Sequence, residues 1–168
     1  SSAADTFLGN LCKQNEAASQ IAADQSCRVV QLRIGIVLSP QGGALQKMLT
    51  PFSMGLGGML GDGKQYWSWI SIDDLIYAIV HVLCRDSISG PVNCVSAQAL
   101  TNRDFSRELA GLFKKRLGPT TPAFALRALV GEMADALLLS SIRAIPTKLF
   151  DSGFDFKFPT LDKALRHV

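Results

Sequence analysis

The feature of this chain that most limits its fold is a nearly continuous run of apolar, mostly β-branched residues between Arg28 and Leu38. A strand that is covered on one face alternates apolar and polar residues, whereas a strand covered on both faces can be apolar along its whole length, as in parallel sheets. The run follows residues 7–23, whose apolar side chains recur every three or four positions, which predicts an amphipathic helix. A helix followed by a doubly covered strand predicts an α/β fold.

A second helix-to-strand step indicates the same fold class. Residues 75–83 are apolar around almost the whole circumference of a helix, so this helix is expected to be largely buried. Asp73 or Asp74 is expected to cap it, because a carboxylate there accepts hydrogen bonds from the free amides of the first turn. The apolar segment 92–95 then predicts a short strand, and repeated steps of this kind build parallel sheets.

From Thr101 onward the sequence predicts mostly helices. Residues 101–104 form a capping box at the start of the first helix. Further helices are expected over 123–139, from Pro146 to Gly153, and after Thr160. The alternation of phenylalanine with charged residues over 154–158 predicts an edge strand.

A glycine-rich stretch separates the two predicted strand regions. It has five glycines in the nine positions 55–63, and Trp67 and Trp69 follow it closely. Residues 58–64 resemble a phosphate-binding P-loop, but Gln65 stands where the magnesium-binding hydroxyl belongs. The loop also follows a short helix predicted over 44–53 and enters a strand predicted over 67–72, which is the reverse of a P-loop. No G-x-G-x-x-G motif follows a strand either, so the chain has no dinucleotide phosphate cradle of its own.

Composition excludes several classes of protein. The net charge of +3 is spread along the chain, which argues against nucleic acid as a partner. No apolar run is long enough to cross a membrane. The four cysteines lie far apart and only two histidines are present, so no metal site is predicted. Buried thiols in a reducing compartment fit a cytoplasmic location.

No catalytic residue can be assigned from the motifs. A Tyr-x-x-x-Lys dyad would provide a phenol acid–base group, but four residues after Tyr66 and Tyr77 stand Ile70 and His81. His81 is expected to face solvent or a neighbouring lobe. Trp67 and Trp69 can stack on a planar ligand or pack internally, and the sequence leaves both alternatives open.

Taken together, these segments resemble the C-terminal half of an atypical extended short-chain dehydrogenase/reductase family, described as NAD-dependent epimerase/dehydratase-like or nucleoside-diphosphate-sugar epimerase-like. Residues 122–168 resemble the small C-terminal domain that is peculiar to this family. The matching segments are LRIGIVLSP at 32–40, GLGGMLGDGKQYWSWISIDDL at 55–75, GPVN at 90–93, TNRDF at 101–105, ALR at 125–127, GEMA at 131–134 and GF at 153–154.

The resemblance implies the C-terminal part of a Rossmann-like parallel sheet, in residues 1–100, and a mostly helical substrate lobe, in residues 101–168. The cofactor would be NAD or NADP, held mainly by the glycine motif of an N-terminal half. By the same resemblance, residues 55–70 form a substrate loop. The predicted cofactor-binding residues are Arg33, Ile34, Gly35 and Ile36, and the predicted substrate-binding residues are Lys64, Gln65, Trp67 and Trp69.

The resemblance also predicts how this chain departs from typical members of the family. Leu8 and Cys12 stand at the positions of the tyrosine and lysine of the catalytic dyad, and neither can replace them at neutral pH. Trp67 and Ser68 replace an arginine–aspartate pair, which predicts a ligand less anionic than a nucleotide sugar. The expected function is therefore that of an NAD(P)-binding, epimerase-like reductase relative with a small-molecule substrate, in which a homodimer is allowed. The alternative is a catalytically inactive dinucleotide sensor or interaction protein on the same fold.

Overall fold

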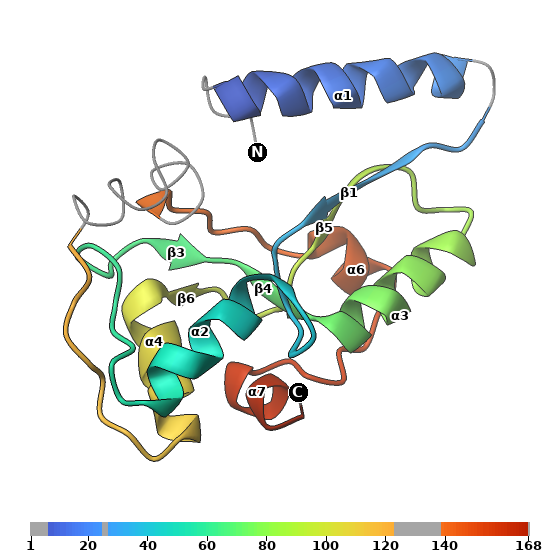
Figure 1. Ribbon diagram of the computed structural model, residues 1–168. Coiled ribbons are helices and arrows are strands. Elements are labelled where there is room, and N and C mark those ends of the chain that lie inside the picture. The colour runs from blue at the N-terminus through green and yellow to red at the C-terminus, as the bar shows by residue number, and fades with distance from the viewer. Residues whose placement is uncertain (1–6, 25–26, 123–138, 168) are drawn as a thin grey trace.

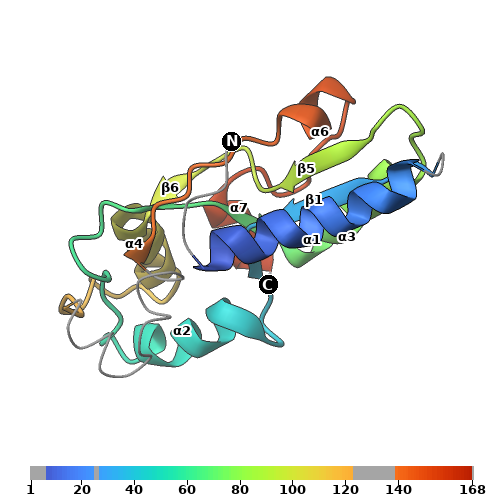
Figure 2. The same ribbon diagram turned by 90° about the horizontal axis from the view of Figure 1, so that it is seen from above.

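A computed structural model describes residues 7–24, 27–122 and 139–167 of the chain (Figure 1). It has the predicted α/β architecture. Helix α1 (Phe7–Asp24) lies on one side of the strands β1 (Val30–Ile34) and β5 (Gly90–Cys94), and helix α3 (Ile72–Leu83) lies on the other side (Figures 1 and 2). The two helix-to-strand steps predicted from the sequence therefore build one layered unit.

The apolar run 28–38 forms two strands instead of the single strand predicted. β1 pairs in parallel with β5, and after Gly35 the chain continues as β2 (Ile36–Leu38), which pairs in parallel with β4 (Trp69–Ser71). The break occurs because the backbone of Gly35 passes very close to that of Ser68. A Cβ atom on Gly35 would lie 2.6 Å from the carbonyl oxygen of Ser68.

The remaining elements pack beside these strands. β3 (Tyr66–Trp67) pairs antiparallel with β6 (Leu100–Thr101), immediately before α4 (Asn102–Leu112). The capping box of α4 is confirmed, since the Thr101 hydroxyl accepts a hydrogen bond from the amide of Asp104. The other helices are α2 (Gly43–Ser53), α6 (Thr147–Asp151) and α7 (Leu161–His167), and the last two occur where the sequence predicts them.

Two hydrophobic clusters hold the described elements together. The cluster between α3, β5 and α6 contains Ile70, Leu75, Ala78, Val82, Ile88, Val92, Cys94, Leu149, Phe154 and Phe156. The other cluster joins residues on both sides of position 100, so the division of the chain into units 1–100 and 101–168 stays a prediction. It contains Leu38, Leu45, Phe52, Trp67, Trp69, Phe105, Leu109, Ala110, Leu161, Ala164 and Leu165.

Three local predictions are wrong. α3 is not largely buried, because only one side packs on the strands and Ile76, Val80 and Leu83 are half or more exposed. Its cap is the hydroxyl of Ser71, which accepts a hydrogen bond from the amide of Asp74. Residues 154–158 alternate between buried and exposed positions as predicted, but they pair with no strand in the described part of the chain.

The helix predicted over 123–139 lies almost wholly outside the described residues. Within 7–24, 27–122 and 139–167, no helix has the length and apolar character that crossing a bilayer requires. No group of three potential metal ligands occurs in the same ranges.

Candidate functional site

The candidate site lies at the carboxyl ends of the parallel strands β1 and β5, which is where open α/β sheets bind ligands. β1 ends at Ile34 and β5 ends at Cys94. The first turns of α1 and the segment 139–146 lie toward this same edge of the sheet (Figures 1 and 2). Elements far apart in the sequence thus converge on one edge.

Segment 139–146 is fixed to β3 by a series of hydrogen bonds. The amide of Ile142 donates to the carbonyl of Tyr66 (2.9 Å), and the amide of Tyr66 donates to the hydroxyl of Ser141 (3.0 Å). The hydroxyl of Ser68 donates to the carbonyl of Ile142 (2.9 Å) and accepts from the amide of Ala144 (2.9 Å). Ser68 therefore organises this edge, a role that its sequence context did not predict.

The structure places the four predicted cofactor residues at this edge but gives them different surroundings. The guanidinium of Arg33 donates two hydrogen bonds of 2.7 Å to the carboxylate of Glu16 on α1. Ile34 is half-exposed. The amide of Gly35 donates to the carbonyl of Cys94 (3.2 Å), and that of Ile36 donates to the carbonyl of Ser68 (2.8 Å). The assignment of these residues to a cofactor stays a prediction.

The Arg33–Glu16 pair shifts the ionisation of both groups. The hydrogen bond from Arg33 lowers the pKa of the Glu16 carboxyl group, and the same hydrogen bond raises the pKa of the guanidinium. The pair therefore stays charged near neutral pH. Together with the hydrogen bonds from Gln31 to the Glu16 carbonyl and the Ser19 hydroxyl, it attaches α1 to β1.

Gly35→Ala is expected to weaken this edge of the sheet. The added methyl group would lie 2.6 Å from the Ser68 carbonyl oxygen and 2.9 Å from a methyl carbon of Val95, so the strands must separate. Overpacking of this kind costs about 2 kcal/mol. Urea denaturation of the full-length protein measures the loss. Unchanged stability would mean that the strand crossing at Gly35 is not closely packed.

The predicted substrate residues divide into buried and exposed members. Trp67 and Trp69 are 4% and 0% exposed and lie in a hydrophobic cluster, where Trp67 packs edge-on against Phe105. Gln65 is also buried and donates to the carbonyl of Leu60 (3.1 Å). Lys64 alone among the four is exposed. The sequence left open whether the tryptophans stack on a ligand or pack internally. The structure shows internal packing for both, and their assignment to substrate binding stays a prediction.

The glycine-rich loop approaches the chain's own backbone. The amide of Gly118 donates to the carbonyl of Gly57 (2.8 Å), and Thr121 exchanges backbone hydrogen bonds of 2.9 Å with Met59 and Gly61. The loop follows α2 and leads into β3, which is the order that argues against a P-loop. Its glycines therefore permit close packing between two segments of the protein.

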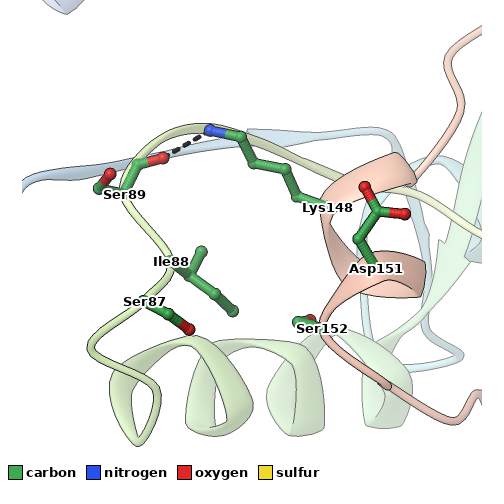
Figure 3. Close-up of a pocket in the computed structure, with 6 residues that line it drawn as sticks. All are labelled: Ser87, Ile88, Ser89, Lys148, Asp151 and Ser152. Carbon is green, nitrogen blue, oxygen red and sulfur yellow. Dashed lines mark hydrogen bonds between the residues drawn. The ribbon is translucent and has the colours of Figure 1, made fainter.

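A surface pocket lies elsewhere in the described part of the chain. The pocket in Figure 3 has a volume of about 300 Å³ and lies beside the start of β5, at the edge opposite to the strand carboxyl ends. Its lining residues are Ser87, Ile88, Ser89, Lys148, Asp151 and Ser152, and Lys148 is already bonded to the carbonyl of Ser89. Behind it, His81 contacts the Ser152 hydroxyl (2.9 Å), and burial lowers the pKa of this imidazole. His81 therefore contacts the residue that follows α6, and its assignment to a contact between lobes stays a prediction.

Sequence reasoning missed Tyr66 and Arg143 at the candidate edge. The guanidinium carbon of Arg143 lies 5.1 Å from the centre of the Tyr66 ring. One signal was present, because Arg143 is the only charged residue between Asp135 and Lys148. Its proximity to Tyr66 could not be predicted, because Ala144 and Ser68, whose hydrogen bond helps hold the two segments together, are 76 residues apart.

Comparison with known proteins identifies the relatives of this chain. The family model named "Domain of unknown function (DUF1731)" matches residues 121–168, which confirms the distinct C-terminal domain predicted for 122–168. An epimerase family protein of Mycobacterium bovis is 41% identical over 167 residues, which cover 99% of this chain and 56% of that protein. The chain thus spans about half the length of the curated relatives it matches.

Solved structures agree with this relationship. The crystal structure of human epimerase family protein SDR39U1 with NADPH is 34% identical, with a TM-score of 0.91 over 98% of this chain and 56% of that one. The nucleoside-diphosphate sugar epimerase of Corynebacterium glutamicum is 32% identical, with a TM-score of 0.78 over 97% of this chain and 31% of that one. The architecture is therefore that of the C-terminal part of a Rossmann-type epimerase.

Proposed function

Because this chain corresponds to the C-terminal part of an epimerase family protein of the short-chain dehydrogenase/reductase type, we propose that it completes an NAD(P)-binding enzyme with a small-molecule substrate. The observation that carries this proposal is the similarity to human SDR39U1, whose crystal structure contains NADPH and matches almost the whole chain. The strand carboxyl ends and segment 139–146 would then face the cofactor and the substrate.

The residues at this edge fit the nicotinamide end of such a cofactor. Ile34 offers an exposed apolar side chain at the end of β1, where a planar ring can pack. The backbone of Gly35 and Ile36 is held by hydrogen bonds, so the contact surface is rigid. The glycine-rich loop is packed against residues 118–121 and is not free to cradle phosphates. Phosphate binding is thus assigned to the N-terminal half of the complete protein.

The role of this chain in the reaction would be to position the substrate beside the cofactor and to enclose it. Bound NAD(P) supplies hydride transfer. Lys64, which is exposed, would contact the substrate, whereas Trp67 and Trp69 would support the edge from the core. Leu8 and Cys12 provide no phenol–lysine dyad, so the proton transfer of the reaction is not assigned to them.

The absent dyad also favours a second candidate function. Without the tyrosine and lysine, a protein of this fold can still bind a dinucleotide, and the bound dinucleotide can change how the protein interacts with a partner. The sensor and the enzyme share the cofactor site and differ only in turnover, so one set of measurements separates them.

The test is calorimetric titration of the full-length protein with NADPH and NADH, combined with hydrogen exchange. We expect saturable binding and slower amide exchange for residues 33–36. Absence of binding for both dinucleotides would overturn the proposal. Binding without redox turnover of a panel of sugar nucleotides and simple carbonyl compounds would favour the sensor.

A further inference from the structure

A tyrosine flanked by two cations forms an exposed group on the outer face of β3. Burial alternates along this stretch, because Gly63, Gln65 and Trp67 are buried whereas Lys64 is exposed and Tyr66 is half-exposed. Lys64 precedes Tyr66, the first residue of β3, by two positions, and both side chains reach solvent. The guanidinium of Arg143 lies over the Tyr66 ring. Lys64, Tyr66 and Arg143 are named the basic cluster below.

The backbone beneath the basic cluster is firmly held. Tyr66 exchanges hydrogen bonds with Ser141 and Ile142, and Ser68 bonds to the residues on both sides of Arg143. The β3–β6 pairing continues toward Lys64 through the bond from the Asn102 amide to the Gln65 carbonyl (2.8 Å). A ligand would therefore meet groups that are already positioned, which reduces the entropy lost on binding.

Several arginines of the protein are paired with carboxylates, whereas the two cations of the basic cluster are not paired within the described residues. Arg28, Arg33, Arg107 and Arg166 each form an ion pair with a carboxylate. Within the described residues, neither Lys64 nor Arg143 forms one. The carboxylate of Asp62 comes near in sequence, but it accepts a hydrogen bond from the amide of Lys64 (3.0 Å). Among the described residues, no carboxylate forms an ion pair with either cation of the basic cluster.

We propose that the basic cluster binds an anionic group of the substrate, a carboxylate or a phosphate; this rests on the proposed function for the identity of the substrate but not for the binding itself. The planar guanidinium of Arg143 can grip two oxygens at once, the Tyr66 hydroxyl can donate a third hydrogen bond, and Lys64 adds charge. Ser68 connects the cluster to the strand crossing, since its carbonyl accepts from Ile36. The anionic group would therefore lie beside the predicted cofactor segment.

This assignment changes how the substrate is expected to be recognised. Trp67, which replaces an arginine of typical relatives, is inside the core and faces no ligand. The positive charge comes instead from Lys64, which precedes β3, and from Arg143 in segment 139–146. Two cations and one phenol provide enough charge and enough hydrogen-bond donors to bind a single anionic group. This agrees with a ligand less anionic than a nucleotide sugar.

The test uses full-length protein saturated with NADPH, so that phosphate probes cannot enter the cofactor site. Inorganic phosphate and malonate are titrated separately, each against sodium chloride at equal ionic strength, and the Arg143 Nε–H signal is followed by NMR. We expect a saturable shift with one probe, which distinguishes phosphate from carboxylate recognition. Arg143→Gln is expected to weaken binding of that probe about tenfold, read from the Tyr66 amide.

The matched control is Arg107→Gln, an exposed arginine on α4 that is paired with Asp104. It should leave the affinity for the probe unchanged, and Arg143→Lys should recover only part of it because the planar fork is lost. Shifts no larger than those of sodium chloride, or equal affinity in Arg143→Gln, would overturn the assignment. If NADPH binding fails while a probe still binds through Arg143, the proposed function falls and the anion site stands.

Discussion

Replacing Asp74 with alanine is expected to lower the free energy of unfolding by about 3 kcal/mol. The carboxylate of Asp74 is 1% exposed and accepts hydrogen bonds from the amides of Lys157 (2.9 Å) and Phe158 (3.0 Å). Alanine would leave both amides without this acceptor beneath the C-terminal segment. Because Phe154, Phe156 and Leu161 are buried on either side of these amides, their packing should loosen as well.

Asp73 provides the matched control for this measurement. Its carboxylate lies 2.9 Å from His167 but is well exposed, so Asp73→Asn should cost less than about 1 kcal/mol. Urea denaturation of both variants in the full-length protein gives the comparison, and hydrogen exchange of residues 154–167 should accelerate only in Asp74→Ala. Equal losses in the two variants would contradict the assignment of Asp74 as the anchor of this segment.

Gly58→Ala is expected to destabilise the protein by about 3 kcal/mol through a steric clash. A Cβ atom on Gly58 would lie 1.9 Å from the carbonyl oxygen of Pro119, which is backbone and cannot rotate away. The loop 55–63 would have to separate from residues 118–121, with loss of the hydrogen bond between Gly57 and Gly118. Thermal or urea denaturation measures the effect.

Gly111→Ala controls for the general consequences of replacing a glycine. Gly111 lies within α4 and has no atom within 4 Å of an added Cβ, so alanine should stabilise the protein by about 0.5–1 kcal/mol through its helix propensity. If Gly58→Ala proved as stable as the wild type, the glycine-rich loop would have to be free of the 118–121 segment, and a ligand-binding role for its glycines would be open again.

Local patterns predicted most of the elements correctly. The spacing of apolar residues located α1, α4 and α7, and the capping box placed the start of α4 at the observed residue. Errors arose where a neighbouring element competes for the same group. Asp74 has the chemistry of a helix cap, but its carboxylate binds the C-terminal segment instead and Ser71 caps the helix.

The candidate site was less predictable than the fold. The sequence singled out the exposed Lys64 and the segment 33–36, which includes the carboxyl end of β1, but it could not place Trp67 and Trp69 in the core. Tryptophan beside glycine is compatible with stacking on a ligand and with internal packing, and only the positions of Phe105 and the C-terminal helix decide between them. The pairing of Tyr66 with Arg143 depends on contacts across the whole second half of the chain.

The sequence by itself determined the α/β class and the parallel arrangement of β1 and β5, because these properties follow from periodicity and from the order of neighbouring elements. Only the tertiary structure decided which faces are covered, where the glycine-rich loop packs and which cations gather at the edge of the sheet. The physical reason is that burial and charge compensation depend on distances between residues remote in sequence. The glycine-rich stretch is an example. Its sequence resembles a ligand-binding loop, whereas the structure shows that it packs against residues 118–121.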